Sequence, residues 1–340
     1  MNLVTIICHP SDIALKLDLV YTVYFNAYVA IRVNKKGTYV LFYRIYSPTL
    51  KGQQLICYAI LYFYRKKGLH MTGQNLNYSG GYSNHTLSQF STRTIAREGA
   101  FLLPYLRDDM SILDCGCGPG SLSLDLAKRL QKTGNIIGMD IQAGQLAAAQ
   151  EQAEQCGLDN VQFLQGSVFS LPFPEQYFDC VLAHAVLYHI PNPEKALQEI
   201  SRVLKPEGIV ALRDADMYAD IIYPRNSTLD AAWNLIYQVF ALNGANIVFG
   251  REQKGQLLAQ GFSPLSLSAS FDMFTSAQEV SDYARFWIDF MGSLHKNLIL
   301  EHQLASENEL NIFMQAFTDW AARPEAYCAR ARCEAVAVKA

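Results

Sequence analysis

Short apolar runs alternate with amphipathic stretches between residues 111 and 214. Brief apolar runs bounded by turn-forming residues are typical of buried strands, and apolar positions every three or four residues are typical of helices. The predicted strands are Ser111–Cys115, Asn135–Asp140, Val161–Gly166, Asp179–His184 and Ile209–Asp214, and the predicted helices are Leu122–Leu130, Ala143–Cys156 and Pro193–Leu204. Strands that alternate with helices imply parallel pairing, so the pattern predicts an α/β fold with a doubly wound, mostly parallel sheet.

The segments on either side of this alternation follow other patterns. Apolar positions at helical spacing between residues 86 and 106 predict helix before the first strand. Beyond Asp214 we expect helices at about 228–243 and 251–260, a strand at about 264–270, helix throughout 276–322 and a closing strand at Ala331–Val338. The region near the C-terminus is therefore expected to be mainly helical.

The first seventy residues are crowded with Tyr, Ile, Phe, Leu, Asn and Lys. Their apolar stretches, Leu19–Ile31 and Leu55–Tyr64, are shorter than the roughly 20 residues that a membrane span needs. The residue order of a secretory signal is missing as well. We hypothesise that the natural start is Met71 and that residues 1–70 are translated upstream sequence or a dispensable extension. A membrane anchor is the less favoured alternative, and no stable membrane insertion is expected.

Composition and charge narrow the classes of function. Half of the 340 residues are apolar, which is typical of a globular protein with a buried core. The formal net charge is -3, whereas a protein that grips phosphate backbones needs a basic surface, so no nucleic-acid partner is expected. The eight cysteines form no Cys-x-x-Cys pair, so no metal site is expected. Reduced, buried thiols are typical of a cytoplasmic protein.

One glycine-rich turn, Asp114-Cys115-Gly116-Cys117-Gly118-Pro119-Gly120, follows a predicted strand and opens a predicted helix. Glycines there let the backbone turn sharply and let a ligand approach without a Cβ in the way. The G-x-G-x-x-G spacing of dinucleotide binders is not met, because Ser121 or Ser123 stands at the third glycine position. The Lys-Ser/Thr pair of phosphate-binding loops is also absent. The spacing therefore counts against an NAD-dependent oxidoreductase.

A second acidic residue, Asp140, ends the next predicted strand. A carboxylate at the tip of the second strand can accept hydrogen bonds from both hydroxyls of a ribose. A helix-capping aspartate is the alternative interpretation.

The turn and Asp140 together resemble the first motifs of class I S-adenosylmethionine-dependent methyltransferases. Two further segments resemble the family in the same order: Leu164-Gln165-Gly166-Ser167-Val168, in which Ser167 stands where Asp is common, and the string from Phe178 to His189, which a helix and Leu204-Lys205-Pro206-Glu207-Gly208 follow. The resemblance extends from about residue 110 to residue 214 and is greatest to the ubiquinone/menaquinone-biosynthesis type.

This resemblance implies a seven-stranded, Rossmann-like methyltransferase fold within a domain at 71–340. Its cofactor-binding core would be 108–215, and substrate-covering helical insertions would lie at about 216–262 and 272–325. The implied cofactor is S-adenosyl-L-methionine, with Asp114 suited to an amino group, Asp140 clamping the ribose and Ile141 beside the adenine. The full set of implied cofactor contacts is Asp114, Gly116, Cys117, Gly118, Gly120, Asp140, Ile141, Gln142, Ser167, Val168, His184 and Tyr82. Tyr82 and Tyr78 belong to an N-terminal segment that folds over the cofactor in similar enzymes.

Methyl transfer from a sulfonium depends mainly on alignment of the acceptor, and a base is needed only if the accepting atom must lose a proton. The candidate catalytic bases are His184 and His189, because both lie at the carboxyl end of the fourth predicted strand and histidine titrates near neutral pH. Packing of His184 against the cofactor is an open alternative. Asp214 and Asp216 are weaker candidates, for which loop and capping roles are the alternative.

Large apolar residues after position 214 have two possible roles, a lid over an apolar substrate or ordinary core packing. They are Trp233, Phe240, Phe274, Phe286, Trp287, Phe290, Phe313, Phe317 and Trp320. The predicted function is methyl transfer to a small apolar or aromatic organic acceptor. The Asn/Asp-Pro-Pro-aromatic string of nucleic-acid methyltransferases is absent after the fourth strand. A catalytically silent scaffold that binds the cofactor is the alternative, and the sequence leaves the oligomeric state open.

Overall fold

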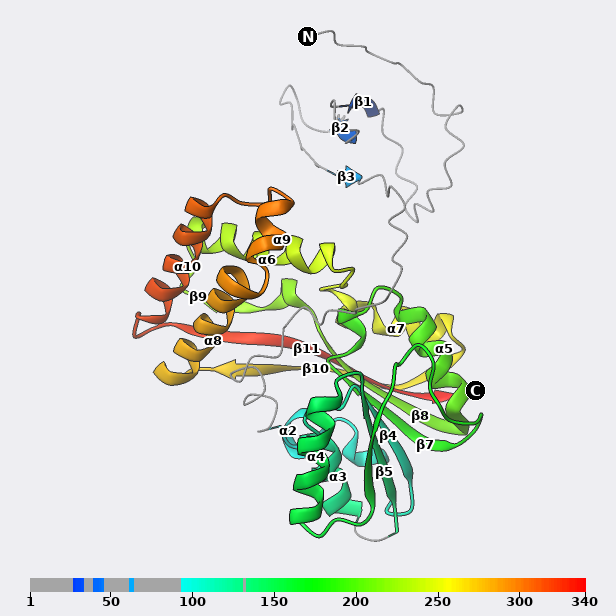
Figure 1. Cartoon of the computed structure of the whole chain (residues 1–340). Coiled ribbons are helices and arrows are strands. Elements are labelled where there is room, and N and C mark those ends of the chain that lie inside the picture. Colours follow the sequence, from blue (N-terminus) through cyan, green and yellow to red (C-terminus); the bar gives the residue numbers. More distant parts are fainter. Residues whose placement is uncertain (1–26, 34–38, 46–60, 64–92, 131–132) are drawn as a thin grey trace. The chain divides into compact units, whose positions relative to one another are not determined.

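A computed structural model describes residues 27–33, 39–45, 61–63, 93–130 and 133–340 (Figure 1). The chain divides into two compact units, Met1–Asn75 and Leu76–Ala340. The first unit contains three antiparallel strands, β1 (Ala27–Val33), β2 (Tyr39–Ile45) and β3 (Leu61–Phe63). Met71, the hypothesised natural start, lies outside the described residues, and that hypothesis stays a prediction.

The second unit is built on one sheet with the spatial order β10-β11-β8-β7-β4-β5-β6. Its parallel strands are β4 (Ser111–Cys115), β5 (Asn135–Asp140), β6 (Val161–Gln165), β7 (Phe178–His184) and β8 (Leu204–Ala215). The antiparallel strands are β11 (Tyr327–Lys339), which pairs with β8, β10 (Phe262–Phe274) and the short β9 (Ile221–Tyr223). The predicted α/β fold is confirmed; β9, an eighth strand off the main path, was not predicted.

Helices cover both faces of this sheet. They are α2 (Ile95–Glu98), α3 (Ser121–Leu130), α4 (Ala143–Gln155), α5 (Pro193–Val203), α6 (Ser227–Leu242), α7 (Phe249–Ala259), α8 (Ala277–Asp289), α9 (Lys296–Glu301) and α10 (Glu307–Ala321). Successive side chains of a strand point to opposite faces. Accordingly, Cys180 and Leu182 of β7 pack with α3, whereas Val181 and Ala183 pack in the core that includes α5 and α7. The sheet is thus doubly wound, as predicted.

Several boundaries differ from the predictions, and β10 and β11 are both longer than expected. In the described part of 86–106, only α2 and the 3-10 turn η1 (Leu103–Tyr105) are helical, because Gly99 ends α2 and Pro104 stands in η1. β8 begins at Leu204, ahead of the predicted Ile209. The helix predicted throughout 276–322 is divided into α8, the π-helical turn η4 (Phe290–Leu294), α9 and α10.

Helices α6, α8, α9 and α10 gather at one end of the long strands β10 and β11 (Figure 1). We call them the helical layer. Its large side chains pack mainly with one another: the Trp233 ring contacts Trp287 at 4.8 Å and Phe317 at 5.7 Å between centroids. Six of the large apolar residues picked out after position 214 are buried, namely Trp233, Phe240, Trp287, Phe290, Phe317 and Trp320. These six are core residues of the layer.

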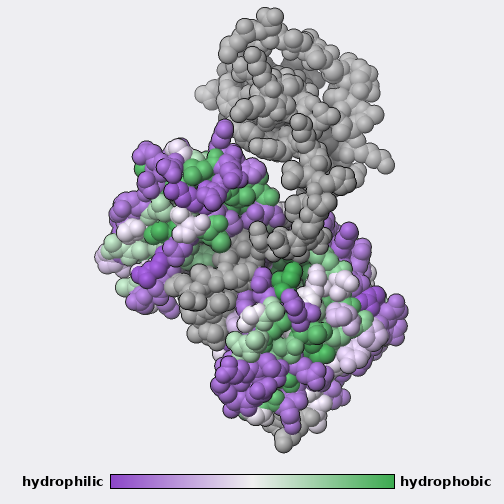
Figure 2. Space-filling view, in the orientation of Figure 1, coloured by the Kyte–Doolittle hydropathy of each residue, from purple (hydrophilic) through white to green (hydrophobic). Residues whose placement is uncertain are grey.

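The helix ends of this layer carry strong local signals. Capping boxes begin both α8 (Ser276 with Glu279) and α10 (Ser306 with Glu309), and each satisfies backbone N–H groups that the first helical turn leaves unpaired. On the face drawn in Figure 2, hydrophilic residues dominate the periphery of the second unit and hydrophobic residues gather towards its middle. Within the described ranges, none of the helices combines the length and the apolar character that crossing a bilayer requires.

Candidate functional site

A cleft lies at the carboxyl ends of β4, β5 and β7. It is lined by Arg93, Asp114, Gly116, Cys117, Gly118, Pro119, Ser121, Leu122, Asp140, Gln145, His184 and Ala185. β4 lies between β5 and β7, so the chain leaves β4 towards one side of the sheet and returns on its other side. Such a switch point at the carboxyl ends of parallel strands is where open α/β sheets bind ligands.

The glycine-rich turn forms one wall of the cleft. Gly116, Gly118 and Gly120 have φ values of +77°, +55° and +78°, in the left-handed region that favours glycine. A Cβ on Gly116 would lie 2.4 Å from Cγ2 of Val186, and one on Gly120 would lie 2.7 Å from the Phe163 ring. Both conformation and space therefore require glycine at these two positions. The turn is tied to β5, because the N–H groups of Gly116 and Cys117 donate to the Met139 carbonyl.

Asp140 faces this turn from the end of β5. Its Oδ2 accepts a hydrogen bond from the Gly118 N–H at 2.9 Å, and its Oδ1 accepts one from the Gln142 N–H at 2.9 Å. The N-cap residue of α4 is Gln142, so Asp140 is not the capping residue of that helix. Each carboxylate oxygen keeps a further lone pair. Asp140 is thus fixed in orientation and can still accept hydrogen bonds from a ligand in the cleft.

Asp114 is the second carboxylate of the cleft, and it is only 1% exposed. Its Oδ2 accepts a 2.6 Å hydrogen bond from the Ser123 hydroxyl. Burial raises the pKa of Asp114 to about 6, with the nearby Asp140 adding to the rise and the Ser123 hydrogen bond opposing it. A positively charged group in the cleft would relieve the cost of keeping this carboxylate ionised.

Gln145, in the first turn of α4, adds an unsatisfied acceptor to the cleft. Its buried Oε1 has no hydrogen-bond partner among the described residues and lies 3.2 Å from the Cβ that an alanine at Gly118 would carry. Buried polar atoms are normally paired, so this atom is suited to a donor on a ligand. Our sequence reasoning missed Gln145, although a polar residue at the start of an Ala-rich helix was a visible signal. It also missed Arg93, which no motif marks.

His184, at the end of β7, contacts two arginines. Its Nε2 lies 2.9 Å from Nη1 of Arg213, and its Nδ1 lies 3.4 Å from Nη1 of Arg93. Arginine only donates hydrogen bonds and a neutral imidazole accepts at only one of its two nitrogens, so only one of these two contacts can be a hydrogen bond at a time. Burial, followed by the charges of Arg93 and Arg213, holds the pKa of His184 well below its usual range. The side chain in the cleft is therefore a neutral imidazole.

His189 lies in the 3-10 turn η2 (Leu187–His189), outside the lining of the cleft. Its ring is 3.7 Å from that of Tyr188 and 5.9 Å from that of Phe240, between centroids. Burial and then the charges of Arg330 and Arg332 lower its pKa well below the usual value. The two candidate bases are thus in different surroundings, and only His184 reaches the cleft.

The other predicted site residues are less close to the cleft. Gly120, Ile141, Gln142, Ser167 and Val168 are not among its lining residues. Ile141 is 38% exposed, the Ser167 hydroxyl accepts a hydrogen bond from the Phe169 N–H, and Val168 packs on the core. Tyr78 and Tyr82 lie outside the described residues. The assignment of these residues to the cofactor stays a prediction.

The two weaker acidic candidates differ from each other. Asp214 is fully buried at the end of β8, and its Oδ1 accepts a 3.3 Å hydrogen bond from the Tyr188 N–H. Burial raises the pKa of Asp214 to about 7. Asp216 forms a two-point ion pair with Arg251 instead. Asp214 thus holds the turn that follows β7, whereas Asp216 is occupied by its arginine.

Comparison with known proteins agrees with this architecture. Residues 106–259 match a family model described as a methyltransferase domain. The chain is 39% identical over 171 residues to a probable methyltransferase, ltbC, of Aspergillus luteorubrus, a match that covers 48% of this chain and 59% of that protein. It is 29% identical over 247 residues to the uncharacterized methyltransferase C1B3.06c of Schizosaccharomyces pombe, covering 69% of this chain and 86% of the relative.

A demethylmenaquinone methyltransferase of Lactobacillus johnsonii is 33% identical over 140 residues, covering 40% of this chain and 55% of that protein. Among solved structures, the YcgJ protein of a Bacillus species is similar with a TM-score of 0.48 and 21% identity, over 71% of this chain and 97% of that one. Over residues 106–259, the sequence matches confirm the predicted resemblance to methyltransferases. The chain spans less than two thirds of the length of the Aspergillus and Lactobacillus relatives.

Proposed function

We propose that the cleft binds S-adenosyl-L-methionine and that the chain transfers its methyl group to a small organic acceptor with an apolar or aromatic body. The observation that carries this proposal is the pair of carboxylates on either side of the glycine turn. Asp114 is buried beneath the turn, and Asp140 is held against it by the Gly118 N–H. The methyltransferase match over residues 106–259 supports the same cofactor.

The residues of the cleft fit the groups of this cofactor. The Asp114 carboxylate suits the amino group of the methionine part, because a cation compensates for a buried negative charge. The free lone pairs of Asp140 suit the ribose hydroxyls. Gln145 Oε1 offers one more acceptor to the same ligand. Ile141 and Ser167 remain our assignments for the adenine end.

Bound S-adenosylmethionine supplies a methyl group on a positively charged sulfur, which leaves as a neutral thioether. The task of this chain is then to hold the acceptor in line with the methyl group and to keep water out. His184 does not accept a proton readily, because burial and two neighbouring arginines disfavour its charged form, so we assign it a positioning role. Neither His184 nor His189 has the near-neutral pKa that an efficient general base needs.

Calorimetry with S-adenosylmethionine and S-adenosylhomocysteine tests the binding half of the proposal. We expect both ligands to bind the full-length protein, and Asp140→Ala to weaken both by at least about tenfold, since charge-assisted hydrogen bonds are lost. Absence of binding by the wild-type protein would overturn the proposal.

Release of S-adenosylhomocysteine in the presence of pooled organic acceptors tests the catalytic half. We expect turnover with pools of aromatic and alkyl compounds. Tight cofactor binding without turnover on any pool would favour the alternative, a catalytically silent scaffold of the same fold.

A further inference from the structure

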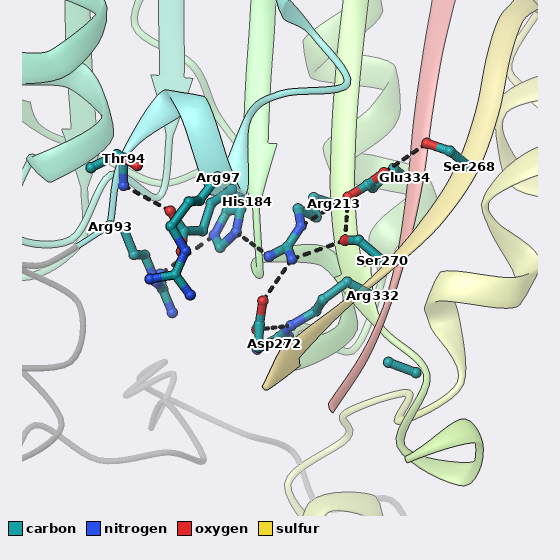
Figure 3. Close-up of polar contacts among 12 residues, drawn as sticks. Arg93, Thr94, Arg97, His184, Arg213, Ser268, Ser270, Asp272, Arg332 and Glu334 are labelled. Atoms are coloured by element: carbon teal, nitrogen blue, oxygen red, sulfur yellow. Dashed lines mark hydrogen bonds and ion pairs between the residues drawn. The ribbon is translucent and has the colours of Figure 1, made fainter. Parts of the chain in front are cut away.

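A row of polar side chains crosses the sheet next to the cleft (Figure 3). His184 of β7 is paired in register with Arg213 of β8, Arg213 with Glu334 of β11, and Glu334 with Ser268 of β10. Residues that are directly opposite on neighbouring strands point to the same face. The row therefore begins at the cleft and continues into the antiparallel half of the sheet.

Arg213 is the centre of this row and is fully engaged. Its Nη1 contacts His184 Nε2 at 2.9 Å, its Nη2 donates to Asp272 Oδ1 at 2.6 Å, and its Nε lies 3.2 Å from Glu334 Oε1. The other oxygen of Asp272 accepts a 2.6 Å hydrogen bond from Nε of Arg332. Arg332 is thus linked to the cleft through Asp272, Arg213 and His184, as Figure 3 shows.

Unlike Arg213, Arg332 has a buried side-chain nitrogen that forms no hydrogen bond with the described residues. The side chain is only 3% exposed, yet its Nη1 is buried without a hydrogen-bond partner among the described residues. A buried donor on a charged group that lacks an acceptor is costly, more so than a neutral one. Such an atom is suited to an anionic acceptor that arrives with a ligand.

Arg332 lies among buried arginines and carboxylates. Arg213 pairs with Asp272 and Glu334, Arg332 pairs with Asp272, and the charge of Asp272 also acts on Arg330. Burial raises the pKa of Asp214 to about 7 and that of Asp220 to about 6, so these two acids carry less than their full negative charge near neutral pH. The acids compensate the three arginines as a group, so the feature that suits a ligand here is the unsatisfied Nη1 of Arg332.

The charge of Arg332 reaches the segment that follows β7. It acts on His184, His189 and Asp214, and the charge of Arg330 acts on His189. His184 and Asp214 lie near the carboxyl ends of β7 and β8, and His189 lies in the turn after β7, on the side of the cleft away from β5. An acceptor that approaches a methyl donor held by Asp114 and Asp140 from this side would come within reach of the Arg332 charge.

We propose that Arg332, supported by Arg213, binds an anionic group of the methyl acceptor, so that the substrate class is organic acids with an apolar or aromatic body. This inference rests on the proposed function. The shared chemistry is a carboxylate or a phosphate ester that accepts charge-assisted hydrogen bonds from a guanidinium.

Calorimetry on the full-length protein, with and without S-adenosylhomocysteine, tests the inference with three probes of similar size. The probes are benzoate, phenyl phosphate and the neutral benzamide. We expect at least one anion to bind about tenfold or more tightly than benzamide, and the better of the two identifies carboxylate or phosphate as the preferred group. Equal binding of all three probes would overturn the inference.

Variants then assign the binding to Arg332. We expect Arg332→Met to reduce anion affinity to the level of benzamide, whereas Arg202→Met removes an ion-paired arginine of α5 and leaves it unchanged. Binding of S-adenosylhomocysteine by Arg332→Met at the wild-type level shows that the variant is folded. An unchanged anion affinity in this folded variant would refute the role of Arg332.

A second variant gives a gain that misfolding cannot produce. Asp272→Asn removes a negative charge shared by Arg213 and Arg332 and keeps an oxygen acceptor, so we expect anion affinity to rise about threefold or more. An affinity that is unchanged or lower would count against the inference, even if Arg332→Met does not fold. Arg332-dependent anion binding in a protein that never binds S-adenosylmethionine would instead defeat the proposed function alone.

Discussion

The two sides of the sheet are assembled from the chain in different ways. On the side of β4 and β5, the cleft is closed by contacts between near neighbours, such as Ser123 with Asp114 and Gly118 with Asp140, which are 9 and 22 residues apart. On the side of β8, β10 and β11, Arg213 meets Asp272 and Glu334, which are 59 and 121 residues away. The first side is a local motif, whereas the second exists only once distant strands have paired.

The two sides also differ in charge. Two carboxylates, Asp114 and Asp140, line the cleft near β4 and β5, whereas the row that starts at His184 pairs Arg213 and Arg332 with Asp272 and Glu334. Our proposals assign a methyl donor with a sulfonium and an amino group to the first set, and the anionic group of an acceptor to Arg332. If both hold, the two ligands bind to groups of opposite charge and do not compete for the same residues.

The largest effect, a loss of stability, is expected for a substitution in the helical layer, which packs at one end of the second side of the sheet. Trp233→Ala deletes a fully buried ring, and we expect it to lower the free energy of unfolding by about 3–5 kcal/mol. Denaturant titration measures this change. Trp233→Phe is the control, because the indole Nε1 has no partner among the described residues and a smaller ring leaves a smaller cavity. A loss below about 1 kcal/mol in Trp233→Ala would mean that the layer is not a packed core.

On the first side, Asp114→Asn should separate stability from binding. The raised pKa of Asp114 means that ionising this carboxyl costs more in the folded protein than in the unfolded chain, so the folded protein loses stability as the pH rises towards and through about 6. Removing the charge should therefore stabilise the ligand-free protein at neutral pH, by at most about 3 kcal/mol for a shift of this size. The same change should weaken S-adenosylmethionine binding by about tenfold or more. A Tm that falls together with a normal affinity would refute this assignment.

The affinity for S-adenosylmethionine should also depend on pH, because Asp114 titrates in the accessible range. Because the folded pKa of Asp114 is raised to about 6, the carboxylate gains a proton as the pH falls through that value. We expect affinity to be constant between pH 6.5 and 7.5 and to decrease towards tenfold per pH unit below about 6. Calorimetry at several pH values measures the profile, for which Asp114→Asn should be flat. A decrease that persists in this variant would place the titrating group elsewhere.

The smallest effect, a modest change in turnover, is expected at His184, which connects the two sides of the sheet. His184→Gln replaces Nε2 with an amide oxygen that can accept from Arg213, so turnover should fall by less than about fivefold. The pH dependence of turnover between 6 and 8 should not change, because His184 is neutral there. Steady-state kinetics with an acceptor from the pools measures both quantities. A loss of about a hundredfold together with a shifted pH profile would establish His184 as a general base after all.

The sequence was sufficient to predict the local side of the molecule. The β4–α3 and β5–α4 boundaries lie within one or two residues of the prediction, because short apolar runs and turn residues encode them directly. Asp114 and the glycine turn form one motif, and Asp140 ends the next strand, so their position at the edge of the sheet could also be predicted from the sequence. Ser167 and Ile141 were placed by resemblance alone, and the described cleft does not include them.

The arginine row was beyond sequence reasoning for a physical reason. Arg213, Asp272 and Arg332 become neighbours only through the register of β8, β11 and β10, and a shift by one residue would turn each side chain to the opposite face. No spacing along the chain encodes that register. Arg93 was missed because the pattern of 86–106 predicts only helix and no motif marks this residue, and β9 was missed because three residues are too few for a period to show.

The position of β11 has a consequence for the order of synthesis. This strand, Tyr327–Lys339, lies between β8 and β10 and also pairs with β9. The pairing of these three strands is therefore complete only after β11 has been translated. A chain emerging from the ribosome begins to fold from its N-terminal side. The glycine turn and Asp140 are thus translated well before Arg332. A nascent chain therefore contains the residues proposed to hold a methyl donor first, and the residue proposed to bind an acidic acceptor last.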